Sequence, residues 1–290
     1  MDIPLYLRSL LNLRRLLAGS AAAVLFAFLA AAAVTEPACA QSPPAVTSED
    51  AKAILRGMAE FMSKLPSFSV DVLDSYDAYQ KTGQKIEFGE TRKITVVRPD
   101  RLRIEVNESD GDKQVLIFDG KQLTLSSSPA NVFAQTPKPG TIDDAIVYFV
   151  RDLHMRLPFA AMLVSTAADD IAQRTTRLDY VEKTSLYGTP AHHLAGRTET
   201  VDYQVWVADG DKPLPLRLVL TYPKEKGQPQ FRAQLSNWNL SPQVTDATFA
   251  FTPPAGATKI AFLAQLPRSV APHPAKSSKS TKSTPSGEQK

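Results

Sequence analysis

The stretch TRKITVVRPDRLRIEVNESDGDKQVLIFDGKQLTLS, residues 91–126, decides the fold class. Apolar and polar residues alternate in short runs, which is typical of β-strands with one buried face. Pro99 lacks a backbone N–H and therefore ends the first strand. The pairs Asp110-Gly111 and Asp119-Gly120 favour the positive backbone angles of tight hairpin turns. This stretch predicts four short antiparallel strands.

Helices are expected on both sides of this region. The first is capped by Thr47 and carries an apolar face from Ala51 to Leu65, and the second follows Thr141 and ends at Pro158. Further strands are expected at 68–72, 86–88, 177–183, 191–195, 201–207, 214–222, 231–240 and 248–251. A long sheet twists, and its apolar face needs a cover. We therefore predict an α+β fold, mainly antiparallel β, in which a curled half-barrel sheet of about eleven strands has helices covering its concave face.

Residues 1–40 have the layout of a secretory signal peptide. Arginines at positions 8, 14 and 15 precede the uncharged run 16–34, and Ala38-Cys39-Ala40 follows. Cleavage before Gln41 would remove the single cysteine and exclude disulfides. The expected location is the periplasm. A lipoprotein leader acylated at Cys39 and an uncleaved inner-membrane anchor are the alternatives.

We divide the chain into a signal peptide (1–40), a linker (41–47), one half-barrel domain (48–265) and a basic tail (266–290). The tail is rich in Pro, Ser, Thr and Lys, and we expect it to be disordered. The chain has a net charge of +3, of which the leader carries +1 and the tail +4, so the domain between them carries about −2. The domain therefore lacks the basic face that nucleic acids require, and no nucleic-acid partner is expected. We also expect the protein to be a monomer. Lysines 276, 279 and 282 could contact an anionic membrane or envelope proteins.

Catalytic signatures such as GxSxG, GxGxxG, the Walker loop and HExxH do not occur in the sequence. We expect no enzyme, no cofactor and no metal. His192 and His193 would point to opposite faces of one strand, and Asp169-Asp170 suits the start of a helix. Residues 107–112 lack the length and the closing glutamate of a calcium loop. Surface or packing roles are expected for His154, Trp206 and Trp238.

The chain resembles a known superfamily in several motifs. VVRPDRLRIEV (96–106), LIFDGKQLTL (116–125) and FAFTPPAGATKI (249–260) occur in the order found in the LolA/LolB-like periplasmic lipoprotein carriers and receptors. VDYQVWVADGDKPLPLRLVLTY (201–222) makes it most similar to predicted periplasmic proteins of the DUF2092 type. The resemblance extends from about Ala51 to Phe262.

This resemblance implies a half-barrel of eleven strands whose helices close an apolar cavity for acyl chains. It also implies that the arginine of the Arg-Pro step, here Arg98, hydrogen-bonds the helical lid and holds it shut. The segment 201–222 and the basic tail are departures from the carrier, so the cargo is left open.

The first functional hypothesis is a non-enzymatic periplasmic binding protein that holds a lipid, an acyl chain or a lipidated peptide under the helices. Arg98 is the candidate latch, and Ile54, Met58 and Phe61 are candidate lid residues. The candidate cavity wall consists of Val70, Val72, Ile94, Val96, Leu102, Ile104, Val106, Ile117 and Leu123. Which strand parity faces inward is left open. The alternatives are an envelope module that binds a protein partner and fills its sheet interior itself, and a hydrolase with an unrecognised site.

Overall fold

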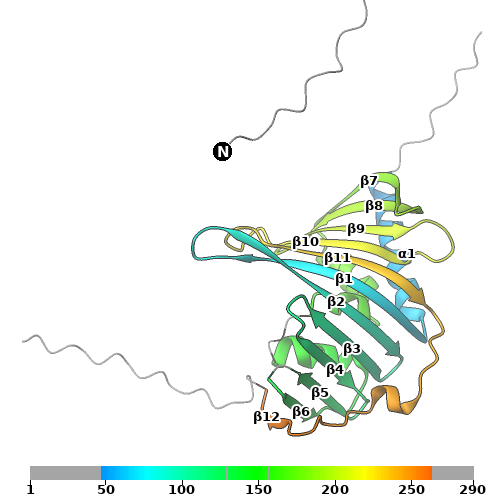
Figure 1. Ribbon diagram of the computed structural model, residues 1–290. Helices are drawn as coiled ribbons and strands as arrows, with labels where there is room; N and C mark the ends of the chain where they lie inside the picture. Colours follow the sequence, from blue (N-terminus) through cyan, green and yellow to red (C-terminus); the bar gives the residue numbers. More distant parts are fainter. Residues whose placement is uncertain (1–46, 129, 154, 156, 263–290) are drawn as a thin grey trace, which may run out of the picture. The chain divides into compact units, whose positions relative to one another are not determined.

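The computed structural model describes residues 47–128, 130–153, 155 and 157–262. The predicted signal peptide, most of the linker and the tail lie outside these residues, as does His154. Figure 1 shows one large sheet with most of the helices gathered along one of its faces. None of the helices in the described part of the chain has the length and apolar character needed to cross a membrane.

One antiparallel sheet of twelve strands organises the domain, and a parallel β12–β6 pair lies at one edge. Its strand order is β12-β6-β5-β4-β3-β2-β1-β11-β10-β9-β8-β7. The strands are β1 (Ser67–Tyr79), β2 (Lys85–Val97), β3 (Arg101–Glu108), β4 (Lys113–Phe118), β5 (Gln122–Ser127), β6 (Val132–Pro137), β7 (Arg177–Leu186), β8 (Thr189–Arg197), β9 (Asp202–Ala208), β10 (Pro215–Thr221), β11 (Gln230–Asn239) and β12 (Thr258–Ile260). The predicted fold class is confirmed.

The stretch 91–126 forms the second half of β2 and most of the meander β3, β4 and β5. Pro99 lies in the turn between β2 and β3, where no ladder bond is required of it. Gly111 and Gly120 have φ of 95° and 84°, so the two Asp-Gly turns need glycine at these positions. The breaks predicted from the sequence are therefore confirmed.

The helices are shorter and more numerous than expected. They are α1 (Ser48–Lys64), α2 (Ile142–Val147), the π-helix η1 (Tyr148–Asp152), α3 (Ala160–Leu163), α4 (Ala167–Arg174) and the 3-10 helix η2 (Asp246–Phe249). Thr47 and Thr141 each form a capping box, with Asp50 and Asp144 respectively. The second helix was predicted to extend to Pro158, and this end is wrong. After α2 the helix widens into the π-helix η1, which ends at Asp152, and Leu153 lies in a bend.

The strand predicted at 248–251 is also wrong. Thr245 and Thr248 form a capping box at the start of η2. Pro253 and Pro254 follow, and they lack the backbone N–H groups that the hydrogen bonds of a β-ladder require. Phe249 is buried, and Phe251 packs against Phe133 with ring centroids 5.3 Å apart. This segment therefore covers the sheet instead of extending it, and the sequence did not predict β6 or β12.

Strand register assigns the two faces of the sheet. In β2 and β3, Val96 pairs with Leu102 and Ile94 pairs with Ile104, and all four lie in the main apolar cluster. Even-numbered residues of these strands therefore face the helices, on the side that we call the concave face. A smaller apolar cluster lies between α1 and strands β7, β8 and β9.

Candidate ligand-binding site

A groove of about 610 Å³ lies at one edge of the sheet, where α1 and α4 approach β7. Leu55, Ile171 and Leu178 give it an apolar floor, and Lys52 and Arg56 contribute basic groups. The complete lining is Ser48, Lys52, Leu55 and Arg56 from α1, Ala168, Ile171 and Ala172 from α4, and Thr175, Thr176, Arg177, Leu178 and Asp179 from the chain that leads into β7. A groove of this size is within the range of small-molecule sites.

The floor of the groove is continuous with the interior of the domain. Leu55 and Leu178 belong to the smaller apolar cluster, and Ile171 packs against both clusters. The groove thus opens above the junction of the two apolar clusters.

A polar contact holds the end of α4 against the sheet. The Thr175 hydroxyl donates to the Ile171 carbonyl at 2.7 Å, so its oxygen can accept from the Tyr203 hydroxyl at 2.8 Å. Burial raises the pKa of Tyr203, which keeps the phenol protonated and able to donate. A Cβ on Gly196 would lie 2.0 Å from the Tyr203 ring. Glycine at this position therefore allows Tyr203 to cross β8 and reach α4.

Arg98, the candidate latch, lies where the β2–β3 turn meets α2. Its backbone N–H donates to the Pro66 carbonyl at 2.8 Å, and the N–H of Ile142 in α2 donates to the Pro99 carbonyl at 2.8 Å. Burial lowers the pKa of the guanidinium, and the Asp143 carboxylate partly opposes this effect. Among the described residues, the buried Nε and Nη2 of Arg98 have no hydrogen-bond partner.

Asp143 extends this contact to the start of α4. Its Oδ1 accepts from the Ser165 N–H at 3.0 Å, and its Oδ2 pairs with the Ser165 hydroxyl. Ser165 lies between α3 and α4. Arg98, α2 and the segment that precedes α4 therefore lie in one chain of contacts.

The candidate wall residues are buried, with two differences from expectation. Val70, Val72, Ile94, Val96, Leu102, Ile104 and Leu123 lie in the main apolar cluster, and Val106 is partly buried against it. Ile117 is buried, but it pairs with Arg103 and lies on the opposite face from Leu116 and Phe118. Its assignment to the cavity wall is wrong, because side chains of a strand alternate between faces.

The candidate lid residues of α1 face the sheet. Met58 lies in the smaller cluster, Ile54 packs against that cluster, and Phe61 packs against the main one. Ile54 and Met58 therefore cover β7, β8 and β9, whereas α2 is the helix beside Arg98. Their role as a lid stays a prediction.

The concave face beneath the helices is filled by the side chains of the protein. Phe68, Phe118 and Phe159 are at most 1% exposed. Phe159 also packs edge-on against Phe231, with ring centroids 5.3 Å apart. In this conformation an acyl chain can enter the interior only if the helices shift.

An ionic cluster lies on the concave face beyond the apolar residues. Arg92 donates from Nε to both carboxylate oxygens of Asp74, at 3.0 and 3.2 Å, and its Nη2 pairs with Glu90. Burial raises the pKa of Asp74 to about 7, and Glu90 adds to the shift against the attraction of Arg92. Sequence reasoning missed this cluster, although Asp74 continues the inward parity of Val70 and Val72.

The sequence candidates for other sites have separate surroundings. His192 bonds Tyr180 and Asp209, whereas His193 stacks on Trp206 with ring centroids 4.0 Å apart. Asp169-Asp170 begins α4, and Trp238 packs against Phe68. Glu108, Asp110 and Asp112 gather in the β3–β4 hairpin, where exposed acids are common without an ion.

Tyr180, His192 and Asp209 form a hydrogen-bonded row that superficially resembles a catalytic relay. The Tyr180 hydroxyl lies 3.1 Å from Nδ1 of His192, and Nε2 lies 3.0 Å from Asp209. Burial raises the pKa of Tyr180, which disfavours the phenolate form. Lys183 also pairs with Asp209, at 2.7 Å, and the row ties the β9–β10 loop to β7 and β8.

The fold and the site together define a class of protein, an open antiparallel half-barrel covered by helices with a groove at its edge. The chain belongs to the DUF2092 family of predicted periplasmic proteins, whose model matches residues 51–263. The family and the periplasmic location predicted from the sequence are confirmed.

Several solved structures are similar to this chain. Lipoprotein LppX from Mycobacterium tuberculosis is 12% identical and has a TM-score of 0.43, over 68% of this chain and 99% of that chain. The LolA superfamily protein NE2245 from Nitrosomonas europaea is 13% identical and has a TM-score of 0.35, over 71% and 99%. The MucA/MucB complex of Pseudomonas aeruginosa matches with 19% identity and a TM-score of 0.39, over 70% of this chain but 61% of that one. No curated protein matches.

Proposed function

We propose that this protein is a non-enzymatic binding protein of the periplasm that takes up the acyl chain of a lipid or lipidated peptide through the groove between α1, α4 and β7. The observation that carries the proposal is the apolar floor of this groove. Leu55 and Leu178 belong to the smaller apolar cluster, and Ile171 packs against both clusters. Each acyl methylene buried there would contribute about 0.8 kcal/mol.

The helices supply the movable cover in this proposal. α3 and α4 are short, and the Thr175–Tyr203 bond joins the end of α4 to β9. Arg98 serves as the latch of the ligand-bound state, since it lies beside α2 and carries two buried nitrogens that a carbonyl of the shifted helix could satisfy. A displaced α2 or α4 would expose the concave face to the acyl chain.

Titration of the mature protein with a fluorescent fatty acid tests the proposal. Ala172→Trp places an indole in the groove, and we expect it to weaken binding at least tenfold, since it removes a contact area worth more than about 1.4 kcal/mol. Gln173→Trp is the matched control, because residue 173 is exposed on α4 outside the groove lining. Equal affinity of both variants and the wild type would contradict the groove as the site.

A second candidate function is a module that binds a protein partner of the cell envelope. The observation that favours it is the closed packing of Phe68, Phe118 and Phe159, which leaves the interior self-filled. If the wild type binds no acyl ligand while affinity purification from envelope extracts recovers a stoichiometric protein, this function replaces the first.

A further inference from the structure

Two hollows meet across the edge strand of the sheet. The apolar groove lies on one side of β7, and a smaller pocket of about 260 Å³ lies over β7, β8 and β9. Arg177 and Asp179 line both hollows. An amphiphile whose chain occupies the groove therefore has its polar end beside the smaller pocket.

The smaller pocket contains two arginines that oppose each other. Arg177 of β7 and Arg197 of β8 are direct register partners. Leu178 in β7 and Leu194 in β8 are buried against α1. Arg177 and Arg197 lie one and three residues away from them in the same strands, so both arginines project from the opposite, convex face. Like charges that face each other across a strand pair are unfavourable, and here Asp179 and Asp202 each compensate one of the two arginines.

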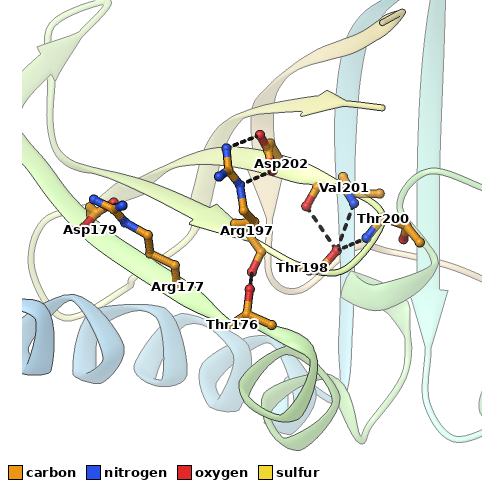
Figure 2. Close-up of polar contacts among 8 residues, drawn as sticks. All are labelled: Thr176, Arg177, Asp179, Arg197, Thr198, Thr200, Val201 and Asp202. Atoms are coloured by element: carbon orange, nitrogen blue, oxygen red, sulfur yellow. Dashed lines mark hydrogen bonds and ion pairs between the residues drawn. The ribbon is translucent and has the colours of Figure 1, made fainter. Parts of the chain in front are cut away.

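The backbone around this pair is well fixed. The N–H and hydroxyl of Thr176 donate to the Arg197 carbonyl at 2.8 and 3.1 Å. In the β8–β9 turn, the Thr198 hydroxyl oxygen accepts from the N–H groups of Thr200 and Val201, at 3.3 and 3.0 Å. Figure 2 shows these contacts on either side of Arg197. Hydrogen bonds thus tie the backbone next to Arg177 and Arg197 at this end of β7 and β8.

Both guanidinium groups keep N–H donors for a further acceptor. Arg177 donates through Nε to Asp179 at 2.8 Å, and Arg197 donates through Nε and Nη2 to Asp202, both at 2.7 Å (Figure 2). A guanidinium carries five N–H donors in a planar fork that suits phosphate and carboxylate. An anionic group can therefore bind while the two aspartates keep their partners.

We infer that the ligand of the groove is an anionic amphiphile whose phosphate or carboxylate binds between Arg177 and Arg197. This inference rests on the proposed function, because the groove supplies the site for the chain. Lys52 and Arg56 also line the groove, where they pair with Glu49 and Glu60 respectively. Charge complementarity thus selects anionic lipids over zwitterionic lipids with the same chains.

The test compares fluorescent phosphatidylglycerol with fluorescent phosphatidylcholine of identical chains, at two salt concentrations. We expect wild-type protein to bind phosphatidylglycerol about tenfold more tightly, since charge-assisted hydrogen bonds exceed neutral ones. In the Arg177→Gln, Arg197→Gln double variant the ratio of the two affinities falls to about one. Both side chains are mainly exposed, so the variant is expected to fold.

Arg151→Gln is the matched control, because Arg151 is an exposed arginine bonded to its own aspartate, Asp152. Its affinity ratio should equal that of the wild type. An unchanged ratio in the double variant, or equal wild-type affinities for both lipids, overturns the inference while the proposed function stands.

Inorganic phosphate alone should not raise the thermal stability of the wild type. A rise that the double variant abolishes would show a site for free anions and would overturn the inference that the arginines bind a lipid headgroup. If neither lipid binds the wild type, the proposed function itself fails.

Discussion

Asp74 and Arg92 lie side by side on the concave face, with Nε of Arg92 3.0 Å from Oδ1 of Asp74, and Glu90 shares the same guanidinium. One cation thus faces two carboxylates on β1 and β2. Glu108 of β3 pairs with Glu90 on the same face, and the partner of Asp74 on β11 is the uncharged Ala233. Burial of the side chain, together with the Glu90 carboxylate, raises the pKa of Asp74 to about 7 against the attraction of Arg92.

The raised pKa predicts how stability depends on pH. The folded state holds a proton on Asp74 between its unfolded pKa of 3.8 and about 7, so the free energy of unfolding should fall as the pH rises through this window. Asp74→Asn should remove this part of the decline, which is on the order of 4 kcal/mol, since the pKa shift spans about three units and one unit is about 1.4 kcal/mol. Urea unfolding at pH 4 to 8 measures both proteins, and parallel curves would contradict the assignment.

Leucines on the two faces of the sheet should differ strongly in their contribution to stability. Leu102→Ala removes a side chain that is 0% exposed in the main cluster and should cost about 2–5 kcal/mol of unfolding free energy. Leu73→Ala on β1, where the side chain is 61% exposed, should change it by less than about 0.5 kcal/mol. Denaturant unfolding of both variants checks the assignment of faces, and similar losses would contradict it.

Gly196 should be required for the contact between α4 and the sheet. Gly196→Ala places a Cβ against the Tyr203 ring and should cost about 1–3 kcal/mol, because the ring must move from Thr175. Gly57→Ala in α1 is the control, since nothing lies within 4 Å of its added Cβ, and it should stabilise by about 0.5–1 kcal/mol. Hydrogen exchange at residues 167–174 should rise only in the first variant.

Replacing the latch should change ligand retention more than stability. Arg98→Leu removes a half-buried guanidinium whose Nε and Nη2 have no hydrogen-bond partner among the described residues, so we expect an intact fold. In the ligand-bound protein we expect faster release of a fluorescent fatty acid and faster hydrogen exchange at residues 142–153. Arg101→Leu is the control, because Arg101 pairs with Asp246 over the convex face. Unchanged release and exchange in Arg98→Leu would mean that Arg98 is not a latch.

The parts of the fold that could be predicted are determined by residues close together in the sequence, whereas the other parts depend on partners far apart in the sequence. Pro99, Gly111 and Gly120 act on their own turns, so the meander could be predicted from the sequence. The strand β12 depends on a parallel partner, β6, more than a hundred positions away, and its three residues carry no local signal.

The candidate site shows the same division. Arg98 could be selected from a short motif, whereas the groove joins α1 to α4 and β7, which are distant in sequence. The opposed Arg177 and Arg197 become visible only when the register of β7 and β8 is known. Asp74 broke the apolar alternation of β1, but its partners Arg92 and Glu90 likewise needed the register.

The most direct test of acyl binding at the edge of the sheet is photocrosslinking with a fatty acid that carries a diazirine near the end of its chain. Irradiated mature protein would be digested, and the labelled residues would be identified by mass spectrometry. Binding through the groove predicts labels on α1, α4 and the start of β7, around Leu55, Ile171 and Leu178, and their loss in Ala172→Trp. Labels confined to other elements, or labelling that Ala172→Trp leaves unchanged, would contradict it.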